Sequence, residues 1–180
     1  MRRVQFTATF IMIKSFYCLV IVSLSLVISS ASASLQPRPM FIESLKEPSI
    51  TDVIDNVVDR AHELLGTPYK WGGTSEDQGF DCSSFLVYLF KTQANIHIPR
   101  TTVAMHRSKA ATIKRSALKP GDAVFFKGNG RGQVNHVGLY IGEGKFIHSP
   151  RTGKNVRIDS LNNTYWNKNY TTAKRFHSAG

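Results

Sequence analysis

The sequence is short of cysteine and of acidic residues, and both shortages limit what the protein can be. Two cysteines, Cys18 and Cys82, are too few to staple a small scaffold with disulfides. With so few thiols and no close cluster of other ligands, a structural zinc site is disfavoured as well. Only 12 acidic residues stand against 23 basic ones, and none precedes Glu43. The chain also has no internal repeat.

The first 33 residues have the three-part pattern of a cleaved export signal. Arg2, Arg3 and Lys14 supply positive charge, an apolar run covers residues 16–28, and small residues at 29–34 offer a cleavage site after Ala33. The apolar run is short for a permanent membrane anchor, which is the alternative. We therefore predict a signal peptide at 1–33 and a periplasmic or secreted protein with no stable membrane anchor after cleavage.

The mature chain has the size of one domain and a marked positive charge. Removal of the first 33 of 180 residues leaves 147, and the basic count falls from 23 to 20 against 12 acids. Residues 34–48 contain three prolines and predict a flexible segment, followed by one domain at 49–180. A net charge of about +8 favours an anionic partner, and export argues for the cell envelope and against nucleic acid.

Helical patterns come before strand patterns along the chain. Thr51 is a plausible N-cap for a helix that stops at Gly66, and a second helix is predicted from Cys82 to Gln93 with Asp81 near its cap. A weaker helical pattern covers 106–117. Short strands are predicted at 123–126, 136–141, 145–148, 155–158 and 171–176, with a tight hairpin turn at 142–144. This order predicts an α+β fold with the helices packed on one face of an antiparallel sheet.

Cys82 would be the only cysteine left after signal cleavage. An unpaired thiol in an oxidising compartment is a liability unless its reactivity is used, so Cys82 is a candidate nucleophile. A thiol attacks as the thiolate, and its pKa must then fall from roughly 8.5. We expect the helix N-terminus and a nearby histidine to lower it.

His136 and His148 are the best placed of the six histidines. His136 begins a predicted strand after a glycine-rich turn, and His148 ends the strand that forms a hairpin with it. Depending on register, the two side chains lie near the same end of the hairpin or near opposite ends. A catalytic pair of Cys82 and His136 is favoured over the alternative, a buried thiol and a core histidine.

Seven segments together resemble the NlpC/P60 family of papain-like cysteine peptidases, over about residues 53–176. They are LGTPYKWGGT at 65–74, GFDCSSF at 79–85, PRTT at 99–102, LKPGD at 118–122, HVGLYIG at 136–142, FIH at 146–148 and the pair YW at 165–166. The resemblance implies a papain-like fold whose nucleophile begins a helix. It also implies a Cys-His-His arrangement in which Cys82 is the nucleophile, His136 the general base and later acid, and His148 the residue that orients His136.

The same resemblance assigns substrate contacts to four further residues. It implies that the hydroxyl of Tyr69 assists the oxyanion together with the backbone N–H of Cys82. Asp81 and Ser83 would contact the peptide stem of the substrate, and Arg100 would meet a substrate carboxylate. The alternatives are a helix cap for Asp81 and a loop-fixing role for Arg100.

The resemblance implies a peptidoglycan endopeptidase that hydrolyses stem peptides or crosslinks through a thioester, without metal or organic cofactor. Its partners would be stem peptides, and we expect a monomer. The scissile bond is left open between D-glutamyl-diaminopimelate and the D-alanyl crosslink. Two alternatives are an amidase or acyltransferase that uses the same chemistry, and a wall-binding module without catalysis.

Overall fold

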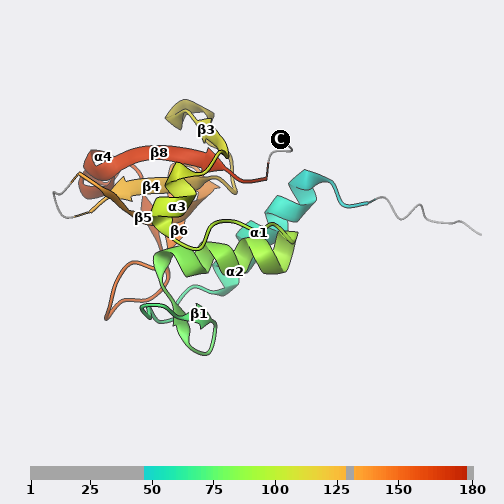
Figure 1. The fold of residues 1–180 in the computed structure, drawn as a ribbon, viewed down its shortest axis with the longest axis horizontal. Helices are drawn as coiled ribbons and strands as arrows, with labels where there is room; N and C mark the ends of the chain where they lie inside the picture. Colours follow the sequence, from blue (N-terminus) through green and yellow to red (C-terminus); the bar gives the residue numbers. More distant parts are fainter. Residues whose placement is uncertain (1–46, 129–131, 178–180) are drawn as a thin grey trace, which may run out of the picture. The chain divides into compact units, whose positions relative to one another are not determined.

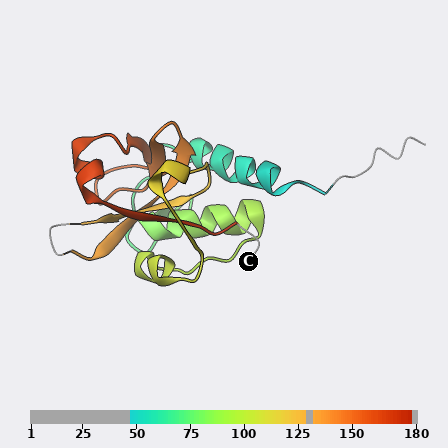
Figure 2. The same ribbon diagram turned by 90° about the horizontal axis from the view of Figure 1, so that it is seen from above.

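The computed structural model describes residues 47–128 and 132–177, which belong to one compact unit covering 45–180. The predicted signal peptide at 1–33 and the segment 34–46 lie outside the described residues. Two helices, α1 (Ile50–Glu63) and α2 (Cys82–Ala94), lie side by side against the sheet (Figures 1 and 2). A small hairpin of β1 (Thr74–Ser75) and β2 (Gly79–Phe80) stands before the N-terminus of α2.

Short polar side chains cap both of these helices. The hydroxyl of Ser49 accepts from the N–H of Asp52, whose carboxylate accepts from the N–H of Ser49 in return. The predicted cap at Thr51 was therefore wrong, because the helix begins two residues earlier and Ser49 accepts from the free N–H of Asp52. Asp81 caps α2 through an equivalent exchange with Ser84, as predicted.

The segment 106–117 is not one helix, as the sequence had suggested. A short helix, α3 (Thr102–Arg107), is followed by strand β3 (Ala111–Ile113) and by one 3-10 turn at Arg115–Ala117. Strand β3 pairs with the last strand, and the ammonium of Lys174 in that strand donates to the carbonyls of Ser108 and Ala110. These long-range bonds satisfy the backbone that a longer helix would have used internally.

All six strands of the main sheet are antiparallel to their neighbours. The other strands are β4 (Ala123–Lys127), β5 (Val134–Gly142), β6 (Lys145–His148), β7 (Arg157–Ser160) and β8 (Tyr170–Arg175), in the spatial order β3-β8-β4-β5-β6-β7. The α+β class is thus confirmed. The predicted hairpin with its turn at 142–144 is present as β5 and β6.

Each face of the sheet has its own apolar cluster. Along β4, Ala123 and Phe125 pack with α1 and α2, whereas Val124 and Phe126 face a second cluster on the other side. Trp166, on the short helix α4 (Thr164–Asn169), packs against this second cluster. The predicted packing of the N-terminal helices on one face is present, and α4, which the sequence analysis did not predict, packs on the opposite face. Within the described residues, no helix is long and apolar enough to cross a membrane.

Asp122 joins the loop before β4 to the end of β8. Its fully buried carboxylate accepts from the backbone N–H of Lys119 at 2.8 Å and from the guanidinium of Arg175 at 2.7 and 2.8 Å. A buried pair is costly to break, because the remaining charge loses both its partner and its water.

We predict that Asp122→Ala lowers the free energy of unfolding by about 3 kcal/mol, because Arg175 keeps a partly buried charge without its partner. Urea denaturation of the wild type and the variant measures the difference. The matched control is Asp55→Ala on the exposed face of α1, which we expect to change stability by less than about 0.5 kcal/mol. Equal losses of stability in both variants would contradict the stabilising role of the Asp122–Arg175 ion pair.

Candidate active site

Cys82 is the first residue of α2, and its thiol lies against strand β5. The Sγ atom is 3.5 Å from the hydroxyl of Thr102, and the backbone N–H groups of Ser83 and Val137 also bond to it. Val137 directly follows His136 in β5. The fold thus brings the nucleophile predicted from sequence to the strand that carries the predicted base.

His136 and His148 converge across the β5–β6 hairpin. Nε2 of His136 lies 2.7 Å from Nδ1 of His148. Gly138 makes room for this approach, because a Cβ at that position would come within 2.5 Å of the Phe146 ring and 3.2 Å of the His148 Cβ. The register that the hairpin sequence left open therefore places the two rings on the same face, in contact.

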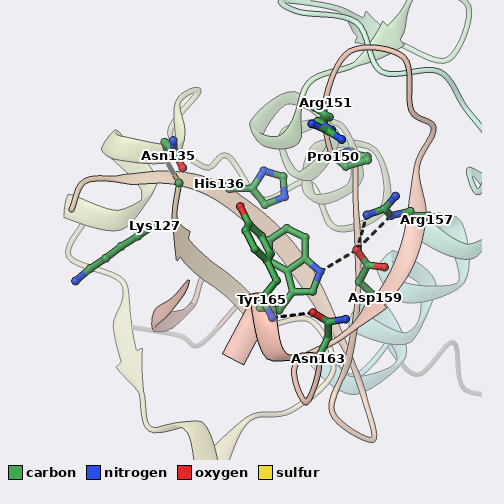
Figure 3. A pocket seen from close by; sticks show the side chains of 11 residues that line it. Lys127, Asn135, His136, Pro150, Arg151, Arg157, Asp159, Asn163 and Tyr165 are labelled. Carbon is green, nitrogen blue, oxygen red and sulfur yellow. Dashed lines mark hydrogen bonds and ion pairs between the residues drawn. The ribbon is translucent and has the colours of Figure 1, made fainter. Parts of the chain in front are cut away.

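Asp159 extends this pair into a chain of three groups. Its Oδ2 atom lies 2.9 Å from Nε2 of His148, and it also accepts from the guanidinium of Arg157 and the indole N–H of Trp166 (Figure 3). Although burial opposes ionisation, the bonds from His148 and Arg157 lower the pKa of Asp159 to about 2. The carboxylate is therefore ionised at neutral pH and can only accept hydrogen bonds.

The acceptor at the end of the chain fixes which nitrogen of His136 is free. Because Asp159 only accepts, the proton of neutral His148 is on Nε2, and its Nδ1 must be an acceptor. His136 then donates from Nε2 to that atom. The Nδ1 atom of His136 keeps its lone pair, as a base beside the thiol requires.

The resting site holds a neutral thiol and a neutral imidazole. Burial raises the pKa of Cys82 above its ordinary value, and the hydrogen bonds from Thr102, Val137 and Ser83 oppose this rise only in part. Burial likewise lowers the pKa of His136 well below the usual range. The predicted lowering of the Cys82 pKa was therefore wrong for the free protein. Desolvation outweighs the effect of the helix N-terminus.

Three of the other predicted site residues form one hydrogen-bonded cluster beside Cys82. The guanidinium of Arg100 donates to both oxygens of Asp81, at 3.3 and 3.0 Å, and to the Ser83 hydroxyl at 3.0 Å. Asp81 also caps α2 and accepts from the N–H of Gly72. Its carboxylate therefore performs the cap role that was held as an alternative, and Arg100 is already bound to it.

Tyr69 is half-buried near the nucleophile. Burial raises the pKa of its phenol, and the thiol of Cys82, when ionised, and the carboxylate of Asp81 raise it further. Its hydroxyl therefore stays protonated and can donate a hydrogen bond. Among the described residues, no group of His, Cys, Asp and Glu side chains is arranged to hold a metal ion.

Sequence reasoning missed Asp159, Arg157 and Thr102 as parts of the site. The strand was predicted to end at residue 158, so Asp159 fell just outside it. The available signal was its place near the strand that follows the one carrying His148. These two strands, β6 and β7, pair with each other and place Asp159 opposite Phe146. Adjacent antiparallel strands bring such diagonal neighbours within reach.

Comparisons with known proteins identify the family and the fold. The NlpC/P60 family matches residues 66–175, and the chain belongs to that family. An NlpC/P60 family protein from Bacillus cereus has a similar solved structure, with a TM-score of 0.65 and 36% identity over 73% of this chain and 41% of that one. The NlpC/P60 domain of the peptidoglycan hydrolase SagA matches 67% of this chain and 97% of its own, with a TM-score of 0.58 and 31% identity.

Several curated relatives are peptidases by name. The murein DD-endopeptidase MepH of Escherichia coli is 49% identical over 66% of this chain and 44% of its own length. The probable endopeptidase NlpC of the same species is 37% identical over 88% of this chain and 98% of its own length. This chain covers only 34% to 58% of the length of four such relatives, MepH among them.

The raised pKa of Cys82 predicts slow alkylation at neutral pH. Iodoacetamide reacts with the thiolate, so the rate rises as pH passes through the thiol pKa. We expect a midpoint above the ordinary pKa of a cysteine thiol, measured by mass spectrometry of the Cys82 peptide across a pH series. A midpoint near neutrality would mean that an ion pair with His136 already exists in the free protein.

Proposed function

We propose that the protein is a cysteine peptidase that hydrolyses peptide bonds in peptidoglycan. The observation that carries this proposal is the hydrogen-bonded series from Asp159 through His148 to His136, in the strand that the Cys82 thiol lies against. These groups supply a nucleophile, a base with its proton position fixed, and a charged acceptor that holds the base in place. Family membership and the names of the relatives support the peptidoglycan substrate.

The geometry supports attack coupled to proton transfer. Nδ1 of His136 takes the thiol proton as Sγ of Cys82 forms a bond to the peptide carbonyl carbon. The imidazolium is stabilised through His148 by the charge of Asp159, which raises the pKa of both histidines. His136 then protonates the leaving amine, and water hydrolyses the thioester.

The acyl half of the substrate would lie on the side of Tyr69 and α2. The backbone N–H of Cys82, at the helix start, and the protonated Tyr69 hydroxyl are suited to hold the oxyanion. We keep Asp81, Ser83 and Arg100 as contacts for the peptide stem. Because Arg100 is 44% exposed while paired with Asp81, its outer face is free to meet a substrate carboxylate.

The D-alanyl crosslink is the bond that the comparisons favour. The murein DD-endopeptidase MepH is 49% identical to this chain, whereas a γ-D-glutamyl-L-lysine dipeptidyl-peptidase of Bacillus cereus is 39% identical over 70% of this chain and 37% of its own. Action on a wall polymer requires export. We therefore also propose that residues 1–33 are a cleaved signal and that the mature monomer works in the periplasm or outside the cell.

Crosslinked peptidoglycan fragments incubated with the protein should yield new fragments only when the thiol is present. We expect the wild type to release uncrosslinked stem peptides and Cys82→Ala to release none, as measured by mass spectrometry. The fragment masses identify the bond. Transfer of the acyl group to an added amine without free peptide would support the acyltransferase alternative. Wall binding by both proteins without any cleavage would support the wall-binding module.

Asp159→Asn should reduce kcat on the order of 100-fold, because His136 loses the charge that stabilises its imidazolium. The acid limb of the kcat/KM profile should also move to lower pH, because the carboxylate raises the pKa of both histidines. The exposed Asp77→Asn is the matched control and should leave both readouts unchanged. A stability loss with an unmoved acid limb would show that Asp159 is only structural.

A further inference from the structure

A cavity of about 640 Å³ adjoins the site, and His136 forms part of its wall (Figure 3). The residues around it come from the facing ends of β4 and β5, from the loop between β6 and β7, and from β7 and α4. Neither Cys82 nor the cluster around Asp81 lines it. The cavity therefore adjoins His136, which transfers the proton in the proposed reaction. It does not adjoin Cys82, which would carry the acyl half of the substrate.

Positive charge is in excess around this cavity. Lys127, Arg151 and Arg157 line it, and among the described residues Asp159 is the one lining carboxylate. Asp159 is already bound to Arg157 at 2.9 Å. Within the described parts of the chain, neither Lys127 nor Arg151 pairs with a carboxylate. Two exposed cations thus remain available to a ligand, one of them a guanidinium that can bind a carboxylate through two parallel bonds.

Polar and aromatic side chains complete a site that suits an amino acid. The side-chain oxygen of Asn163 accepts from the N–H of Tyr165, so its amide nitrogen is left to donate (Figure 3). Trp166 stacks on His136 at a ring distance of 5.4 Å, and Tyr165 packs on Trp166 from the side. These rings form a wall for the aliphatic part of a ligand whose acidic group meets the cations.

From this arrangement we propose that the cavity binds the leaving half of the substrate through a free carboxylate close to the scissile amine. This inference rests on the proposed hydrolysis, in which the amine that leaves takes its proton from His136. In a D-alanyl crosslink, the acylated amine of diaminopimelate is attached to a carbon that also carries a carboxylate. Lysine has no carboxylate on the corresponding carbon. The cations therefore select a leaving group that carries this acid.

The test compares two crosslinked peptides that differ only in that carboxylate, which is free in one and a carboxamide in the other. We expect the wild type to cleave the free acid with a kcat/KM about tenfold higher, as for one charge-assisted hydrogen bond. Arg151→Gln should bring the ratio close to one by slowing only the free acid. Lys127→Gln should lower the ratio less, since an ammonium is a point charge.

The control for both variants is Lys91→Gln, which removes one charge at the far end of α2 and should keep the full ratio. Calorimetric titration of the released stem peptide, which carries the freed amine and its neighbouring carboxylate, into Cys82→Ala gives a readout that needs no catalysis. We expect its affinity to fall about tenfold on adding Arg151→Gln. Cleavage of both peptides at equal rates would overturn this inference and leave the hydrolase intact. Cleavage of neither would overturn the proposed function and this inference with it.

Discussion

The ionised carboxylate of Asp159 is the group on which the chemistry of the site depends. A carboxylate with a pKa of about 2 can only accept hydrogen bonds, so it orders every proton between itself and the nucleophile. His148 must donate to it, and His136 must donate to His148. The lone pair that remains on His136 is the base. Arg157 and Trp166 donate hydrogen bonds to the same carboxylate oxygen. These bonds keep the partly buried Asp159 side chain in place.

Burial sets the second constraint, and it acts on the nucleophile. The thiol of Cys82 begins a helix, and backbone N–H groups point at it, yet desolvation still raises its pKa. A neutral thiol resists alkylation, while the ordered histidines can take its proton once a substrate carbonyl is in position. The site therefore combines protection at rest with activation on binding. The positive cavity beside His136 adds a preference for the leaving group without changing the nucleophile.

Much of the fold followed from local patterns, and the errors share one cause. The capped helix at Cys82 and the hairpin that carries both histidines were predicted because caps, glycine turns and alternation are local signals. The segment 106–117 was misassigned because β3 exists only through pairing with β8 and bonds from Lys174. Asp159 was missed for the same reason, since its partner His148 lies on the neighbouring strand and eleven residues earlier.

By itself the sequence determined the family and the α+β class, and it predicted Cys82 and the two histidines as site residues, because these depend on residue types in a fixed local order. Only the tertiary structure decided the contact between the His136 and His148 rings, the bond from His148 to Asp159 and the positive charge of the adjoining cavity. It also reversed the expected direction of the Cys82 pKa. Proton positions and pKa values depend on register and desolvation, which arise when distant strands and helices pack together.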